Sequence, residues 1–408
     1  MQEDRDKTLG AGEAWPRDPI AAVTHADPYP FYADLVVARP LSRDEALGLW
    51  VAAGAGAVTA VLASELCRVR PAAEPVPRAL LGSPAGEVFR HLVRMTDGPG
   101  HCPLKRAVAA ALSSIDGPRT AAAARESARL LLEDLAPRRS SGPVAGGALL
   151  DLAFRLPVHT VGSLLGVPRR ELDETAGWVS DFAGCLAPAA DPAAVERGKV
   201  AAGHLLDRFR RLLQERDAGG GLLAALAGEA ARAGLDDPDA VTANAVGFLF
   251  QAYEATAGLL GNTLRALAAR PAALAAVKAD PGRLRDAVQE VLRHDPPVQN
   301  TRRFLARSGV VAGREMGEGD VILVVLAAAN RDAAANPHPD RFDLDRKDRR
   351  IFTFGAGAHA CPGETLAAAI AEAGAEAVIG AGLDLAELAG PVAYRPSANL
   401  RIPLFGAT

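Results

Sequence analysis

Apolar residues recur along most of the chain at the spacing typical of α-helices, with interruptions at Pro, Gly and Asp. The pattern predicts a long helix over residues 237–270, because an Asp-Pro pair opens this segment and a proline follows it. At about 1.5 Å per residue, such a helix is roughly 50 Å long and can cross a whole domain. Its middle, residues 248–260, is apolar on nearly all sides, so we expect it to be buried. Glu254 is anomalous within this stretch.

A second predicted helix begins at Asp280-Pro281 and ends before the proline pair at 296–297. It carries Glu290 and Arg293, which lie on one helical face because they are three residues apart. A pair of this kind on a surface helix contributes little to stability. The spacing alone therefore assigns the pair no function.

Strands are predicted at residues 310–311, at 320–325 after a Gly-rich turn, and at 350–354. Residues 46–64 need separate treatment, because they carry no charge over 19 residues and could span a membrane by length. Three glycines interrupt this segment, and its composition changes from strand-forming to alanine-rich. We therefore expect a buried strand, a turn and a short helix here.

Composition places the chain among globular proteins, with 408 residues, 49% of them hydrophobic and 23% charged. A net charge of −4 and the lack of a basic run give no reason to expect a nucleic-acid partner. The four cysteines are scattered without a CxxC pair, which indicates reduced thiols in the cytoplasm. The first residues are too charged for a secretory signal.

Residues 354–363, with the sequence FGAGAHACPG, place one cysteine in a glycine-rich loop. One interpretation is a dinucleotide fingerprint, but the chain that follows is too short for the rest of a nucleotide-binding sheet. A zinc site would have only His359 and Cys361 as ligands, without a second cluster to complete four. A catalytic pair of the same two residues would leave the glycines unexplained.

An axial haem ligand is the interpretation that accounts for the whole loop. Cys361 precedes a predicted helix that begins at Pro362, and a helix N-terminus favours a thiolate. The glycines let the main chain approach a flat macrocycle, and Phe354 can shield the sulfur. A thiolate ligand donates electron density to the iron and favours O–O cleavage.

The pattern FGxGxHxCxG resembles the haem-binding loop of the cytochrome P-450 family, with every fixed position matched. Glu290 and Arg293 resemble the family's structural pair, and Arg341 is the predicted third member of that network. Further likenesses occur at residues 97–101, 164–168 and 329–332. The resemblance implies a mainly α fold with a small β region, formed as one cytochrome P-450 domain over residues 27–408. A partly disordered extension, residues 1–26, would precede it.

The resemblance also implies the residues of the site. Cys361 would be the axial ligand of the haem iron, and basic side chains would bind the two haem propionates. The predicted cofactor-binding residues are His101, Lys105, Arg303, Phe354, His359, Cys361 and Gly363. Lys105 stands where the family usually has arginine, so its hydrogen bond would be single rather than forked.

On the long helix, the family has an acid followed by an alcohol, which relay protons to the site of dioxygen activation. Glu254 supplies the acid, but Ala255 replaces the alcohol, and Thr256 lies about 100° further round the helix. These three are the predicted catalytic positions, and the departure at Ala255 puts ordinary hydroxylation in doubt. The predicted substrate-pocket residues are Phe248, Gln251, Ala252, Val298, Asn300, Ser397 and Asn399.

The function implied is that of a haem-thiolate oxidoreductase with haem b and without bound flavin or nicotinamide. Electrons would come from ferredoxin and ferredoxin reductase, and one oxygen atom would be inserted into a small organic substrate, a secondary metabolite. The alternative reaction is oxidative C–C or C–N coupling, or ring closure, without oxygen insertion. The alternative outside the enzymes is a non-catalytic haem sensor. We expect a cytoplasmic monomer without nucleic-acid or membrane partners.

Overall fold

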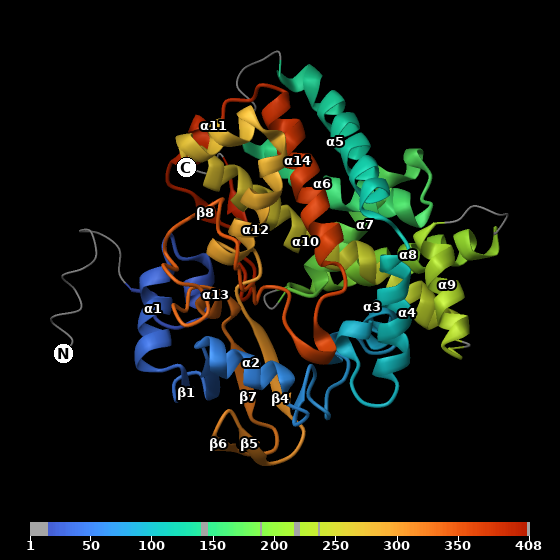
Figure 1. Ribbon diagram of the computed structural model, residues 1–408. Helices are drawn as coiled ribbons and strands as arrows, with labels where there is room; N and C mark the ends of the chain where they lie inside the picture. Colours follow the sequence, from blue (N-terminus) through green and yellow to red (C-terminus); the bar gives the residue numbers. More distant parts are fainter. Residues whose placement is uncertain (1–14, 140–145, 188–189, 216–220, 236, 406–408) are drawn as a thin grey trace.

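The computed structural model describes residues 15–139, 146–187, 190–215, 221–235 and 237–405. Helices make up most of the molecule, and the larger sheet lies at one end of it, at the bottom of Figure 1. The predicted fold class, mainly α with a small β region, is confirmed.

The bounds of the elements are as follows. The α-helices are α1 Tyr29–Ala38, α2 Ala55–Ala63, α3 Pro84–His91, α4 His101–Ser113, α5 Gly117–Arg139, α6 Gly146–Leu165, α7 Leu172–Cys185, α8 Pro192–Gln214, α9 Leu222–Arg232, α10 Pro238–Ala268, α11 Pro271–Ala279, α12 Leu284–His294, α13 Leu326–Asn330 and α14 Glu364–Gly380. The strands are β1 Leu41–Asp44, β2 Leu49–Ala52, β3 Cys67–Arg68, β4 Thr301–Leu305, β5 Gly309–Val311, β6 Arg314–Met316, β7 Val321–Val324, β8 Ala393–Tyr394 and β9 Pro403–Leu404. Short 3-10 helices include η3 Val93–Met95, η5 Pro281–Arg283 and η6 Gly357–His359.

Helix α10 is the predicted long helix and occupies the centre of the helical part (Figure 1). The Asp237 carboxylate caps it by accepting hydrogen bonds from the N–H groups of Asp239 and Ala240. Helices α3, α6, α12 and α14 pack around α10, which explains why most of its side chains are buried. The second predicted helix is also confirmed, with η5 as its first turn and α12 as its body.

The larger sheet has the strand order β1-β2-β7-β4-β3, with β2 and β7 parallel and the other pairs antiparallel. Residues 46–64 form the end of the β1–β2 turn, β2 and α2, so the predicted strand, turn and short helix are confirmed. The strands predicted at 310–311 and 320–325 correspond to β5 and β7. The sequence patterns missed their partners β4 and β6.

The strand predicted at 350–354 is wrong. In this segment the Arg350 N–H donates to the Asn336 side chain at 3.0 Å, and the Phe352 N–H donates to the Asn330 side chain at 2.7 Å. The two amides therefore take the place of a neighbouring strand as hydrogen-bond partners. The segment enters the cysteine loop as an irregular, side-chain-supported chain.

The predicted N-terminal extension divides into two parts. Residues 1–14 lie outside the described residues. In the remainder, the Trp15 ring contacts the Phe31 ring edge-on, at 6.0 Å between centroids. The buried Arg401 guanidinium donates to the carbonyls of Val23, His25 and Ala26. Residues 15–26 are thus held on the folded domain.

One helix among the described residues, over 147–165 of α6, is long and apolar enough to span a membrane. About 67% of that stretch is buried inside the fold, and α6 packs against α10 and α5. This burial is what a core helix of a folded domain shows.

Candidate functional site

The loop that carries Cys361 is held by its main chain. The Cys361 N–H donates to the Phe354 carbonyl at 2.8 Å, which closes the loop. Gly355 and Gly357 adopt φ angles of +70° and +68°, in the left-handed region that favours glycine. A Cβ at Gly357 would also lie 2.9 Å from the Leu62 carbonyl at the end of α2. These two glycines are therefore required by the backbone conformation of the loop and, at Gly357, by its packing against α2.

Helix α14 begins at Glu364 with Gly363 as its N-cap, so the predicted start at Pro362 is two residues too early. A backbone hydrogen bond from Gly363 reaches the Cys361 side chain and acts to lower the thiol pKa. Burial acts in the opposite direction and raises the pKa of Cys361 overall, although Lys105 and Arg94 also lower it. The thiol is nevertheless accessible to solvent.

Three of the predicted cofactor-binding side chains lie together over this loop. The His101 Nε2 is 3.2 Å from the Ala358 carbonyl, and the Lys105 Nζ donates to the Ala360 carbonyl at 2.5 Å. The His101 and His359 rings are 4.3 Å apart between centroids. Helix α4 thus places two residues against a loop that is distant in sequence. Burial is the main cause of the lowered pKa values of His101 and Lys105.

The structure adds two residues that the sequence analysis did not assign to the cofactor. Arg94, in η3, is near enough to Cys361 for the two charges to influence each other. It makes no hydrogen bond or ion pair with any described residue. Asp97 accepts a hydrogen bond from the His359 Nε2 at 3.0 Å, so this histidine already has a carboxylate partner. Arg303, in β4, is buried, and this burial lowers its pKa, with smaller influences from Cys67, Asp97 and Arg94.

These side chains form what we call the basic group, which consists of Arg94, His101, Lys105, Arg303 and His359. Asp97 is the one carboxylate that directly contacts the group among the described residues. The excess of cationic side chains suits a cofactor with two carboxylates. The Arg94 guanidinium has no partner among the described residues, and a carboxylate of such a cofactor would supply one. Together with the accessible Cys361 thiol, this donor set fits a haem with a thiolate ligand.

The predicted catalytic positions on α10 have distinct surroundings. Glu254 forms an ion pair with Arg395, at 3.0 Å between Oε1 and Nη1. Burial raises the pKa of Glu254, and Arg395 partly opposes that effect. Ala255 is half-buried, and Thr256 is 1% exposed with no hydrogen-bond partner for its hydroxyl. No hydrogen bond or ion pair connects Glu254 to the cysteine loop within the described part of the chain.

Other helical threonines, including two in α10 itself, bond differently from Thr256. The hydroxyls of Thr160, Thr242 and Thr263 each donate to the carbonyl four residues earlier. The Thr256 hydroxyl does not, so it remains an unsatisfied polar group next to Ala255. A buried group of this kind requires an explanation, such as a water molecule or a ligand.

The two predicted pocket segments near residues 298–301 and 397–400 are adjacent. Val298 bridges Leu400, and the Gln299 N–H donates to the Asn399 carbonyl. The amide of Asn300 donates to the Ala398 carbonyl at 2.9 Å. On α10, Phe248 is buried, Ala252 is half-buried, and the Gln251 amide donates to the Gly247 carbonyl at 2.9 Å. Ser397 bonds within its own turn, to the Leu400 N–H and the Asn399 side chain.

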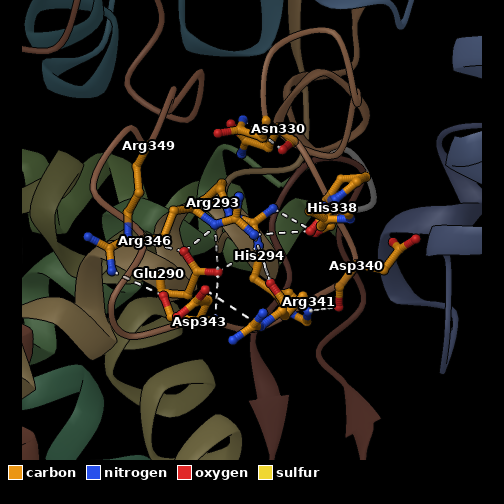
Figure 2. Close-up of polar contacts among 12 residues, drawn as sticks. Glu290, Arg293, His294, Asn330, His338, Asp340, Arg341, Asp343, Arg346 and Arg349 are labelled. Atoms are coloured by element: carbon orange, nitrogen blue, oxygen red, sulfur yellow. Dashed lines mark hydrogen bonds and ion pairs between the residues drawn. The ribbon is translucent and has the colours of Figure 1, made fainter.

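The structural network around Glu290 differs from the prediction in one member. Glu290 and Arg293 are both completely buried and form two hydrogen bonds, at 2.7 and 3.1 Å (Figure 2). Arg346 and Arg349 complete the network, with their Nε atoms 3.4 and 3.1 Å from the Glu290 carboxylate. The prediction of Arg341 as the third member of this network is wrong.

The side chain of Arg341 is 72% exposed and lies 3.6 Å from Asp343. Only its main-chain carbonyl takes part in the network, as an acceptor for Arg293. The segment over residues 338–350 wraps around Glu290, so that its later arginines, rather than Arg341, point inward (Figure 2).

Comparison with known proteins agrees with this geometry. The sequence profile described as cytochrome P-450 matches residues 283–375. The chain is 30% identical to the cytochrome P-450 monooxygenase PikC of Streptomyces venezuelae, over 84% of this chain and 80% of that protein. It is 29% identical to the 6-deoxyerythronolide B hydroxylase of Saccharopolyspora erythraea, over 92% of this chain and 94% of that one.

Solved structures show the same relationship. The structure of CalO2 superposes with a TM-score of 0.81 at 27% identity, over 96% of this chain and 98% of that one. RauA, solved with a biosynthetic intermediate of aurachin RE, gives a TM-score of 0.76 at 25% identity, over 96% and 97% of the two chains. The cysteine loop, the basic group, the Glu290 network and these similarities lead to one conclusion: the chain belongs to the cytochrome P-450 family of haem-iron oxidoreductases.

Proposed function

We propose that the protein is a haem-thiolate monooxygenase that inserts one oxygen atom into a neutral secondary metabolite. The observation that carries the proposal is the position of Cys361, in a glycine-supported loop directly below the basic group. The printed names of the relatives support it, since they include a hydroxylase and a monooxygenase.

In this proposal Cys361 ligates the iron of haem b, and the basic group binds the haem carboxylates by charge-assisted hydrogen bonds. The haem supplies the activation of dioxygen when it is bound. Glu254 takes up protons from solvent and passes them inward along α10, because it is the acid in the apolar middle of that helix. Phe354 and Gly363 support the ligand loop, Gly363 through its hydrogen bond to the Cys361 side chain.

The electron donors in this proposal are ferredoxin and ferredoxin reductase, and the protein acts as a cytoplasmic monomer without bound flavin or nicotinamide. The sequence contains no flavin, nicotinamide or iron–sulfur motif that would supply electrons internally. This supports a separate donor protein.

The substrate is expected to be apolar and uncharged where it contacts α10. The amides of Gln251 and Asn300 each use one N–H on a backbone carbonyl, which leaves a second N–H and the amide oxygen as neutral hydrogen-bonding groups for a ligand. Phe248, Ala252 and Val298 supply apolar surface. A neutral natural product fits such a lining better than an acid or an amine.

Oxidative coupling or ring closure is the second candidate reaction, and Ala255 is the observation that favours it. Without an alcohol at this position, a hydrogen bond must come from the substrate or from water, or the reaction must end without oxygen transfer. The unsatisfied hydroxyl of Thr256 does not restore the missing alcohol, because it lies about 100° away around α10.

Replacement of the ligand tests the haem-thiolate assignment. The reduced protein with carbon monoxide is expected to show the absorption band that gives the family its name, and Cys361→Ala is expected to abolish that band. Cys102→Ala is the matched control, since Cys102 is also accessible but belongs to α4. A band that survives in Cys361→Ala contradicts the assignment.

Replacement of Ala255 tests the reaction. We expect well-coupled turnover in the wild type and no gain in product per NADH for Ala255→Thr, measured with a surrogate ferredoxin and reductase. Ala255→Val separates the effect of added volume from that of the hydroxyl. A large gain confined to the threonine variant contradicts substrate- or water-assisted proton delivery. Labelled dioxygen decides between the two reactions, because a coupling enzyme leaves no label in its product.

A further inference from the structure

The ion pair between Glu254 and Arg395 joins two parts of the molecule with separate roles in the proposed function. Glu254 lies in the middle of α10, where the neighbouring side chains are apolar. Arg395 follows β8 directly and opens the loop over residues 395–402, which leads to β9. The pair is half-exposed, with 36% of the Arg395 side chain and 25% of the Glu254 side chain accessible. It therefore connects the interior of α10 to solvent.

Arg395 is held in place by two contacts besides the ion pair. Its N–H donates to the Ile402 carbonyl at 2.9 Å, across the base of the loop. Its guanidinium lies 5.2 Å from the centre of the Phe154 ring on α6. Phe154 in turn packs against Tyr253, at 4.9 Å between ring centroids. The guanidinium is thus directed at Glu254 by contacts that do not involve the carboxylate.

The same loop also forms part of the proposed substrate pocket. Its Ala398 and Asn399 carbonyls accept hydrogen bonds from Asn300 and Gln299, and Leu400 bridges Val298. Residues 397–400 belong to the same short loop as Arg395, so a ligand that displaces them acts within two residues of Arg395. The acid on α10 and the pocket wall are linked through one side chain.

Few other charges bear on Glu254. Arg395 is the charged group that affects its ionisation, and the opposing influence is burial. Tyr253, from the same turn of α10, is hydrogen-bonded to Ser180 of α7, and its hydroxyl also feels the charges of Glu254, of Arg395 and of Asp151 on α6. These groups act on the tyrosine hydroxyl. Control of the Glu254 carboxylate therefore falls mainly on Arg395.

We propose that Arg395 is a positioning residue for Glu254, and that the loop 395–402 couples occupation of the substrate pocket to the ionisation of this acid. This inference rests on the proposed function for the identity of the pocket. Contact with Arg395 favours the carboxylate form of Glu254, which can accept a proton from solvent. When the contact is lost, burial favours the carboxylic acid, which keeps its proton until the pair forms again.

The test follows the protonation of Glu254 in the holoenzyme by infrared spectroscopy, through the carboxylic-acid C=O band that Glu254→Gln removes. We expect Arg395→Met to make Glu254 a weaker acid by about two- to fivefold, the range for half-exposed pairs, and Arg395→Lys to restore most of the difference. Arg314→Met is the control, because Arg314 is exposed on β6 and has no ion pair with any described residue. Equal titrations in wild type and Arg395→Met overturn the positioning role.

Coupling to the pocket is tested with two iron ligands. Phenylimidazole binds iron and also fills space beside it, whereas imidazole binds iron alone. We expect phenylimidazole to shift the Glu254 titration more than imidazole in the wild type, and the two to act equally in Arg395→Met. Equal shifts in the wild type overturn the coupling. A wild-type protein without the thiolate–carbon monoxide band refutes the proposed function instead, and the effect of Arg395 on Glu254 can still be measured in that case.

Discussion

At the residue scale, His294 shows how the fold fixes a protonation state. Its Nδ1 accepts a hydrogen bond from Arg331 at 3.0 Å, and its Nε2 donates to the Asp340 carbonyl at 3.1 Å. Burial, with Arg331 as the next cause, lowers the pKa of His294 to about 2. The imidazole is therefore neutral in the folded protein at any ordinary pH, because a second proton would face the Arg331 guanidinium.

This histidine predicts acid sensitivity. Below about pH 6.5 the unfolded chain binds a proton at His294 that the folded protein cannot bind, so stability falls as pH decreases, by roughly 1.4 kcal/mol per pH unit. His294→Gln keeps one donor and one acceptor and is expected to flatten the fall in unfolding free energy between pH 7 and 5. His204→Gln, at an exposed site, serves as the control. Parallel slopes for wild type and His294→Gln would contradict the explanation.

At the scale of elements, the Glu290 carboxylate joins α12 to the irregular segment that leads into the cysteine loop. Besides three arginines, it accepts the Asp343 N–H at 3.0 Å. Every one of these donors other than Arg293 comes from residues 343–349. Loss of the carboxylate would leave several buried cationic groups without compensation.

The network predicts a contrast between two arginines. Glu290→Ala is expected to cost roughly 3–5 kcal/mol and to leave little soluble protein with haem. Arg349→Ala is expected to be clearly destabilising, whereas Arg341→Ala should change the unfolding free energy by less than about 0.5 kcal/mol. Denaturant unfolding of the three variants measures the difference. Similar losses for Arg341→Ala and Arg349→Ala would contradict the arrangement in Figure 2.

Local signals account for what the sequence predicts correctly. The ends of α10 follow from a capping aspartate and from prolines, and these act within one turn of the helix. The third member of the Glu290 network depends on the path of an irregular segment, which no periodic pattern defines. The sequence also did not predict that Arg94 lies near Cys361 or that Arg395 pairs with Glu254, because both arrangements depend on packing between distant segments. The sequence of residues 350–354 predicts a strand, but the backbone N–H groups of this segment bond to the side chains of Asn330 and Asn336. A sequence pattern does not reveal such distant side-chain acceptors.

At the scale of the whole molecule, Arg401 ties the two ends of the described chain together. It is 1% exposed, pairs with Asp295 at 2.9 Å and lies 3.6 Å from the centre of the Tyr394 ring. Asp295 also accepts a hydrogen bond from the Tyr29 hydroxyl at 2.5 Å. One buried cation thus contacts both the N-terminal segment, at residues 23–26, and Tyr394 of strand β8.

Removal of this cation is expected to loosen the N-terminal segment. Arg401→Met removes the cation that pairs with Asp295 and the guanidinium donors to three carbonyls, at a cost of roughly 3–5 kcal/mol. Hydrogen exchange of the backbone amides in residues 20–29 should become faster. Arg17→Met is the control, since the Arg17 side chain is 87% exposed in the same segment. Unchanged exchange in Arg401→Met would show that other contacts hold the segment.

The acceptors of Arg401 have a consequence for how this region can vary. Val23, His25 and Ala26 contribute main-chain oxygens, which every amino acid possesses. Substitutions at these positions can therefore accumulate without touching the anchor, while a deletion or insertion shifts all three oxygens away from one rigid guanidinium. Natural variants are expected to change freely at the exposed Ala26, to keep an apolar residue at the fully buried Val23, and to preserve the number of residues between Ala26 and α1.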